Sequence, residues 1–162
     1  PFDLANVVAG FNFDRVLPTG KTKDMAVIGY GASELEDYLE EELEKQGRYI
    51  NPDPNPEKGY FYRSDHISFA KKGVPVLYSD DGFDLEEGGI EEGFKEIYDY
   101  TNFRYHGVND EYDPSWNLEG FEQTIDTIFN ISQDLSNSPD WPNWYEGNEF
   151  RATRDAQLSL KK

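Results

Sequence analysis

Residues 63–78, with the sequence RSDHISFAKKGVPVLY, place a helix signal directly before a strand signal. Ser64 is a residue type that favours the start of a helix, and Gly73 is the type that most often follows its end, so we expect a short helix over 65–72. The next segment, 74–78, is apolar and predicts a strand. A helix followed at once by a strand is typical of an α/β fold.

Two apolar segments upstream extend this alternation. Segments 6–16 and 25–30 are apolar and β-prone, as expected of strands that are covered on both faces. Ser33 and Glu36 match a capping box, in which each side chain satisfies a backbone N–H of the first helical turn. We therefore expect a helix that begins at Ser33 and closes at Gly47.

Turn-forming residues indicate where the chain leaves these elements. Segment 51–58 has three prolines in eight residues, which predicts a surface loop. A second loop is expected at 79–82, where Ser-Asp-Asp-Gly follows the strand. The acidic, glycine-interrupted segment 82–100 indicates only a short helix late in its length.

An apolar stripe predicts a long helix near the C-terminus. Large apolar side chains recur at helical spacing over about five turns, and we expect them to pack on a sheet. The stripe consists of Leu118, Phe121, Ile125, Ile128 and Leu135. We divide the chain into a domain over 1–138 and a tail over 139–162, which is expected to wrap the domain through Trp141, Trp144 and Phe150.

The composition describes a folded, strongly acidic chain. Its 162 residues include 15 Lys+Arg and 33 Asp+Glu, a net charge of −18, and 15% are aromatic. Such a charge is repelled by nucleic acid and by anionic lipid, so we expect neither as a partner. No apolar run is long enough to cross a membrane, and the first residues do not resemble a signal peptide. The absence of cysteine excludes disulfides and thiolate zinc sites.

Elimination leaves metal chemistry as the candidate function. Neither a G-x-S-x-G motif nor a glycine-rich phosphate loop is present. Asp14 lies late in an apolar strand, where a metal ion or an arginine must offset its charge. Asp65 and His66 suit either a metal site or an ordinary helix start. His106 is followed four residues later by Asp110, the pattern of a metal ligand with a carboxylate partner or of a solvated loop.

Taken in order, these segments resemble a known family. The succession of NFD at 12–14, the stretch 63–78 and YHGVNDEYDPSW at 105–116 is similar to the C-terminal half of the co-catalytic zinc aminopeptidases. Relatives of that family include glutamate carboxypeptidase and glutaminyl cyclase. The resemblance covers residues from about 5 to about 156. It implies part of a three-layer α/β/α sandwich with a mixed sheet, its N-terminal strands missing.

The resemblance implies a role for each motif residue. Asp14 matches a carboxylate zinc ligand and His106 an imidazole zinc ligand, normally of two different ions. Tyr105 matches a tyrosine that stabilises the oxyanion of the scissile carbonyl.

Three further residues are implied as supports of the site. Asp65 matches an acid in a hydrogen-bond network near the metals, and His66 is implied beside it. Asp110 is the candidate hydrogen-bond partner of His106.

The chain also departs from the family pattern. The first histidine ligand, the bridging aspartate and a Glu-Glu pair that includes the general base all precede the strand that carries Asp14 in the family. We therefore expect this chain to be an inactive fragment of a two-zinc aminopeptidase that hydrolyses peptides with a free N-terminus. Expected partners are the missing N-terminal half or, through an open sheet edge, a second copy. Relatives with such a tail imply a periplasmic or secreted location.

Other functions remain open. An acidic calcium-binding or other non-enzymatic binding module could use Asp80, Asp81, Asp84 and Glu86, although no EF-hand loop is present. The same fold could also act as a carboxypeptidase or a glutaminyl cyclase. The acidic segment 84–96 favours a substrate's α-amino group by charge, or forms a solvated face.

Overall fold

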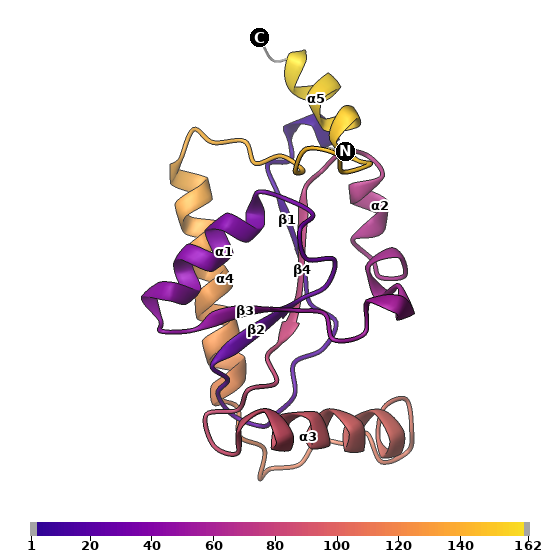
Figure 1. The fold of residues 1–162 in the computed structure, drawn as a ribbon, viewed down its shortest axis with the longest axis vertical. Coiled ribbons are helices and arrows are strands. Elements are labelled where there is room, and N and C mark those ends of the chain that lie inside the picture. Colours follow the sequence, from indigo (N-terminus) through magenta and orange to yellow (C-terminus); the bar gives the residue numbers. More distant parts are fainter. Residues whose placement is uncertain (1–2, 161–162) are drawn as a thin grey trace.

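The computed structural model describes residues 3–160, which form a mixed four-stranded sheet with helices on both faces (Figure 1). The strands are β1 Gly10–Asn12, β2 Asp24–Val27, β3 Tyr49–Pro52 and β4 Val76–Asp81. Their order is β1-β4-β2-β3, with β2 antiparallel to β4 and the two outer pairs parallel. The predicted α/β class and mixed sheet are confirmed.

The helices lie in layers on either side of this sheet. They are α1 Leu35–Lys45, α2 Ile67–Ala70, α3 Gly89–Phe103, α4 Glu119–Asn137 and α5 Arg151–Ser159. Single 3-10 turns are η1 Leu4–Asn6, η2 Pro56–Lys58 and η3 Tyr60–Tyr62. Figure 1 shows α1 and α4 on one side of the sheet, α2 on the other and α3 across one end. Within residues 3–160, no helix has the length and apolarity needed to cross a membrane.

Each face of the sheet buries its own apolar cluster. Under α1 and α4 the cluster contains Met25, Val27, Leu35, Leu39, Leu43, Leu77, Ile131 and Leu135. On the opposite face it contains Ile28, Ala32, Phe61, Ala70, Tyr78, Trp144 and Phe150. The tail therefore contributes Trp144, fully buried, to the second cluster.

The start of α1 uses half of the predicted capping box. The Glu36 carboxylate accepts hydrogen bonds from the backbone N–H groups of Gly31, Ala32 and Ser33, at 2.7, 2.7 and 3.2 Å. The Ser33 hydroxyl, however, has no hydrogen-bond partner among the described residues. One carboxylate thus satisfies three amides, and the serine is not needed as a cap.

The first and fourth strands differ from their predicted lengths. β1 is only three residues long because it pairs with β4 alone, from Gly10 to Asn12, and the chain then leaves the sheet. The strand predicted over 74–78 begins later and runs on to Asp81. The loop predicted at 79–82 is therefore wrong, because those polar residues pair with β2.

Three further elements were misjudged at their ends. The loop predicted over 51–58 begins inside β3, an edge strand, where a proline is tolerated at its last residue. The helix expected over 65–72 is reduced to the four residues of α2, because Ser64 is engaged elsewhere and does not cap it. α3 is fifteen residues long rather than a short helix.

Only part of the predicted apolar stripe of α4 packs on the sheet: Leu135 is buried in the cluster under α1 and α4, and Ile128 packs against that cluster. Leu118 and Ile125 are 47% and 63% exposed, whereas Thr124 and Thr127 are buried. Buried Arg48 explains this orientation, because its guanidinium donates to the Thr127 hydroxyl at 3.2 Å. The buried face of α4 therefore combines the small polar side chains of Thr124 and Thr127 with the apolar Ile131 and Leu135.

The tail is fixed to the first residues of the chain. Arg154, fully buried, donates hydrogen bonds to the carbonyl oxygens of Val7 and Val8, at 2.9 and 2.8 Å. The Trp144 indole N–H donates to the Gly73 carbonyl at 3.2 Å. The Arg154 bonds join α5 to the segment that leads into β1, and the Trp144 bond joins the tail to the segment after α2.

Candidate active site

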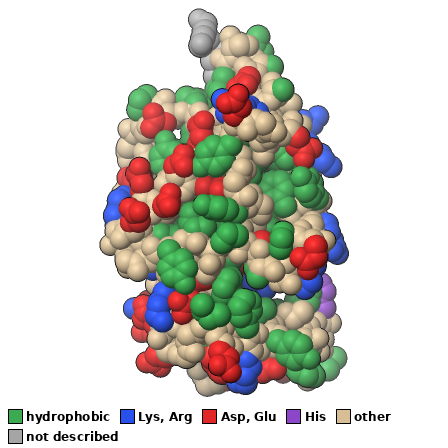
Figure 2. All heavy atoms as spheres, in the orientation of Figure 1, with side chains coloured by type: hydrophobic (Ala, Val, Ile, Leu, Met, Phe, Trp, Pro, Cys, Tyr) green, Lys and Arg blue, Asp and Glu red, His purple; other side chains and the backbone are tan. Residues whose placement is uncertain are grey.

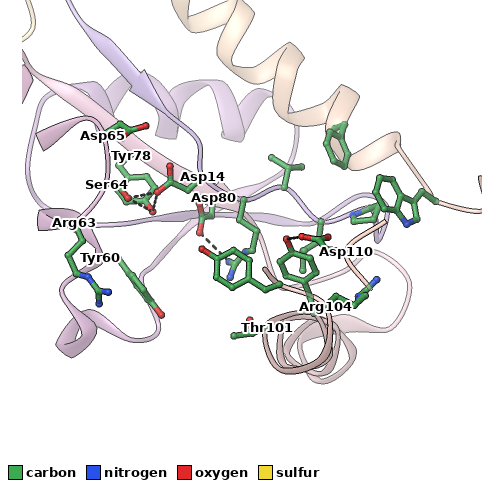
Figure 3. Close-up of a pocket in the computed structure, with 18 of the residues that line it drawn as sticks. Asp14, Tyr60, Arg63, Ser64, Asp65, Tyr78, Asp80, Thr101, Arg104 and Asp110 are labelled. Atoms are coloured by element: carbon green, nitrogen blue, oxygen red, sulfur yellow. Dashed lines mark hydrogen bonds and ion pairs between the residues drawn. The ribbon is translucent and has the colours of Figure 1, made fainter. Parts of the chain in front are cut away.

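A cavity of about 500 Å³ opens at the carboxyl ends of β1 and β4. Its walls come from the segment 14–18 after β1, the segment 60–65, and the end of α3 with the residues that follow it. Figure 3 shows Asp14, Ser64 and Tyr78 converging on one side of this cavity, with Arg104 and Asp110 on the other side. The carboxyl edge of neighbouring parallel strands is where α/β proteins commonly assemble their sites.

Asp14 is the most firmly held carboxylate of this cavity. Its Oδ2 accepts hydrogen bonds from the hydroxyl groups of Ser64 and Tyr78, the second at 2.7 Å. Its Oδ1 accepts one from the Asn12 amide at 3.1 Å. The two hydroxyl groups also lie 3.1 Å apart, so the three side chains form a closed triangle.

These hydrogen bonds keep Asp14 ionised. Partial burial alone would raise its pKa, but the hydrogen bonds from Ser64, Tyr78 and Asn12 outweigh burial, and the pKa lies below its usual value. Burial, together with the neighbouring Asp14, raises the pKa of Tyr78, which therefore stays protonated and able to donate.

Behind Asp14 lies a buried group of two carboxylates and one arginine. Arg15 is 3.3 Å from Asp80 and 3.5 Å from Asp81. Burial raises the pKa of Asp80 to about 6 and that of Asp81 to about 7, although the guanidinium opposes the shift. Asp81 also accepts a hydrogen bond from the Leu17 backbone at 2.6 Å. This group holds the segment 14–18 against the end of β4.

The outer wall of the cavity is aromatic and carries two arginines. Arg104 lies over the Tyr100 ring at 5.4 Å and 3.8 Å from Glu96. Arg63 lies over the Tyr60 ring at 6.0 Å. Aromatic rings and guanidinium groups therefore face the same space as Asp14.

The residues predicted from the motif 63–66 take different positions. Asp65 is exposed and lines the cavity, and its predicted supporting role stays a prediction. His66 is 3% exposed and packs between the rings of Phe61 and Tyr78, at 4.6 and 5.0 Å. Burial lowers the pKa of His66, which favours a neutral ring behind the cavity wall.

The residues predicted from the motif 105–110 are only partly brought together. Tyr105 and Asp110 line the cavity, whereas His106 is not among its lining residues. The His106 ring is exposed and stacks on the Tyr105 ring at 3.8 Å. Asp110 accepts a hydrogen bond from the Tyr100 hydroxyl at 3.3 Å, and no hydrogen bond joins it to His106 within the described residues.

A metal ion fits Asp14 but finds no complete site in this part of the chain. An ionised carboxylate has about four acceptor positions, and three of those of Asp14 are used. Zinc sites use three or four protein ligands. Across residues 3–160, no group of three or more His, Asp or Glu side chains is placed to hold a metal ion.

The acids considered for calcium binding do not converge on one point. Asp80 and Asp81 lie in β4 beside Arg15. Asp84 forms an ion pair with Lys23 at 3.2 Å and accepts a hydrogen bond from the Tyr49 hydroxyl at 2.9 Å.

Sequence reasoning missed the residues that support Asp14. Ser64 was assigned to a helix cap, and Tyr78 was treated only as the end of a strand. The register of β1 against β4, which sets Asn12 opposite Tyr78, is what brings the Tyr78 hydroxyl to Asp14. No local pattern could indicate that pairing, because it joins residues 64 positions apart.

Comparison with known proteins identifies the family. No curated protein and no solved structure matches the chain. The model of peptidase family M28 matches residues 1–132, more than three quarters of the sequence. The matched range contains β1 with Asp14, the segment 63–66 and the segment 105–110. The chain therefore belongs to peptidase family M28.

Proposed function

We propose that this chain contributes one side of the active site of a zinc aminopeptidase. The observation that carries the proposal is the ionised Asp14, held by Ser64 and Tyr78 at a cavity that Tyr105 also lines. Members of family M28 are generally zinc-dependent peptidases. Two zinc ions are the number implied by the family resemblance, and Asp14 would ligate one of them. Zinc polarises the scissile carbonyl and lowers the pKa of a bound water.

The residues of this chain have two tasks in this proposal. Asp14 presents a fixed negative charge, and Tyr105 donates its hydroxyl proton in a hydrogen bond to the oxygen that becomes negative during hydrolysis. Tyr105 is 52% exposed, so its ring is free to approach a bound peptide.

Apart from His106, which is exposed and does not line the cavity, the remaining ligands and the general base are proposed to lie on polypeptide that precedes Pro1. Two features support this view: the described residues do not complete a metal site, and β1 pairs on one side only. The edge of β1 can therefore accept a further strand. The 162 residues alone are expected to be inactive.

The charge of the cavity favours an aminopeptidase. Its lining includes five carboxylates, Asp14, Asp65, Asp80, Asp110 and Glu111, and three arginines, Arg15, Arg63 and Arg104. Arg15 is already engaged by Asp80. A net negative cavity attracts a free α-ammonium group.

A carboxypeptidase is the second candidate. Arg63 and Arg104 face the cavity, and the single ion pair of Arg104, with Glu96, is long at 3.8 Å. A guanidinium group in this position could receive the carboxylate of a peptide C-terminus.

The experiment uses the protein expressed together with its preceding coding sequence. An aminopeptidase cleaves peptides that are amidated at the C-terminus and spares those acetylated at the N-terminus, and a carboxypeptidase does the reverse. Asp14→Asn should lower the zinc content and reduce kcat/KM at least about 100-fold. Tyr105→Phe should reduce kcat about 10- to 100-fold with little change in KM.

Tyr98→Phe is the matched control, because Tyr98 is 61% exposed on α3 and does not line the cavity. The proposal fails if Asp14→Asn retains both full zinc content and wild-type activity, or if neither class of blocked peptide is cleaved.

A further inference from the structure

A second cavity, of about 220 Å³, adjoins the candidate active site. Tyr60 belongs to the lining of both cavities, and its side chain is 38% exposed. It is the first residue of η3, and Figure 3 shows it beside Ser64 and Arg63. The two cavities are therefore neighbours with a shared aromatic wall.

Five of the twelve residues that line the second cavity are aromatic. Tyr30 and Tyr62 are 54% and 59% exposed, and the rings of Phe61 and Phe150 form its buried floor. Asp53 is the charged residue among its described lining residues. Aromatic rings gain most by burying another apolar group, and a carboxylate at the wall disfavours an acidic one. The exposed rings of Tyr30 and Tyr62 therefore offer an apolar side chain a surface on which to pack.

The segments that form the walls of this cavity contact one another directly. The Ala32 carbonyl accepts hydrogen bonds from the Tyr145 backbone and the Asn148 side chain, at 2.9 and 3.3 Å. Gly29 has φ +77°, and a Cβ at this position would lie 2.3 Å from the Phe61 ring. Only glycine permits this close approach, so the turn before α1 and the segment 60–62 form one surface. Such preorganisation reduces the entropy cost of binding.

We propose that the second cavity is a distal subsite for the peptide substrate of the first. This inference rests on the proposed peptidase function. The peptide would extend from the Asp14 side of the active site across the Tyr60 ring and place a large apolar side chain, aromatic or aliphatic, against Tyr30 and Tyr62. An extended peptide advances about 3.3 Å per residue, so a dipeptide is too short to use both cavities. The preferred substrates are then oligopeptides rather than dipeptides.

The test measures binding, so that it does not depend on catalysis. Alanine peptides of two to six residues, each with one phenylalanine moved along its length, are titrated into the 162-residue chain by calorimetry. We expect affinity to rise about tenfold or more once the phenylalanine passes a threshold distance from the N-terminus. Tyr30→Ala should abolish that rise and leave the binding of dipeptides unchanged.

Tyr98→Ala is the matched control, because Tyr98 is similarly exposed and lines neither cavity. It should bind every peptide as the wild type does. A length dependence that survives Tyr30→Ala, or affinities that do not depend on length at all, would overturn the distal subsite. If neither class of blocked peptide is cleaved, the peptidase proposal fails, but the measured peptide affinities do not change. The two failures are therefore distinguishable.

Discussion

At the scale of single residues, the site depends on hydrogen bonds between distant positions. Asp14 was predicted late in an apolar strand with an arginine or a metal ion offsetting its charge, but it lies just after β1, is exposed, and is held by hydroxyl groups, while Arg15 pairs with Asp80 and Asp81. Its supports could not be identified, because Ser64 and Tyr78 lie 50 and 64 positions away. Local sequence patterns describe one segment at a time. The site instead depends on how β1 pairs with β4, which brings Tyr78 to Asp14.

The buried carboxylate of Asp81 leads to a pH prediction. Its pKa rises from the ordinary 3.8 to about 7 in the folded chain, mainly through burial. The folded state therefore holds an extra proton between about pH 4 and pH 7, and the free energy of unfolding falls as the pH rises through this range. Asp81→Asn removes that fall, so between pH 5 and pH 8 the variant should gain on the order of 2–3 kcal/mol relative to the wild type.

Urea denaturation at several pH values measures this difference. Asn keeps an oxygen that can accept the hydrogen bond from Leu17. Asp126→Asn, on the exposed side of α4, serves as the control and should follow the wild type at every pH. A constant difference between wild type and Asp81→Asn across the range would contradict the prediction.

At the scale of elements, the existence of helices and strands was easier to predict than their ends and faces. α1 and α4 were both predicted, yet only part of the apolar stripe of α4 is buried: Leu135 lies in the core, whereas Ile125 is exposed. Gly120 shows why, since a Cβ there would lie 2.3 Å from the carbonyl oxygen of Gly20. Close backbone approach and the bonds of Arg48 fix the orientation of α4, and neither is visible in a hydrophobic pattern.

Two substitutions on α4 distinguish the observed face from the predicted one. Thr127→Ala removes the hydroxyl that accepts from buried Arg48, so it should lower the free energy of unfolding by about 1–2 kcal/mol. Ile125→Ala, at a 63% exposed position of the predicted stripe, should change it by less than about 0.5 kcal/mol. Chemical denaturation of the 162-residue chain measures both. A larger loss for Ile125→Ala would show that Ile125 packs on the protein as the predicted stripe implies.

At the scale of the whole molecule, the acidic surface also carries exposed apolar side chains and an open sheet edge at β1. Figure 2 shows acidic side chains outnumbering basic ones on one face, with hydrophobic side chains grouped among them. Ile125 and Phe129 are 63% and 59% exposed on α4, and β1 has one neighbouring strand. The net charge of −18 opposes contact between copies, whereas these apolar side chains favour it.

Self-association of the chain should therefore depend on salt. Raising the ionic strength screens repulsion between acidic copies, so sedimentation velocity should show a larger dimer fraction at 0.5 M than at 0.05 M NaCl. Phe129→Lys should reduce dimer formation at high salt, because it places a charge in the apolar contact. Glu119→Gln, at an exposed position at the start of the same helix, changes the net charge by the same amount and is the control. A monomer at every salt concentration would rule out this association.

Arg154 links the last helix, α5, to the beginning of the described chain. Its guanidinium donates hydrogen bonds to the backbone carbonyls of Val7 and Val8. These residues directly precede β1, and Asp14 follows β1 at the cavity. The helix lies outside the 1–132 stretch matched to the family. A protein truncated after residue 132 would keep every motif residue. It would, however, lose the Arg154 hydrogen bonds that hold Val7 and Val8. Residues outside the family match thus help to fix the segment that leads into β1 and the candidate active site.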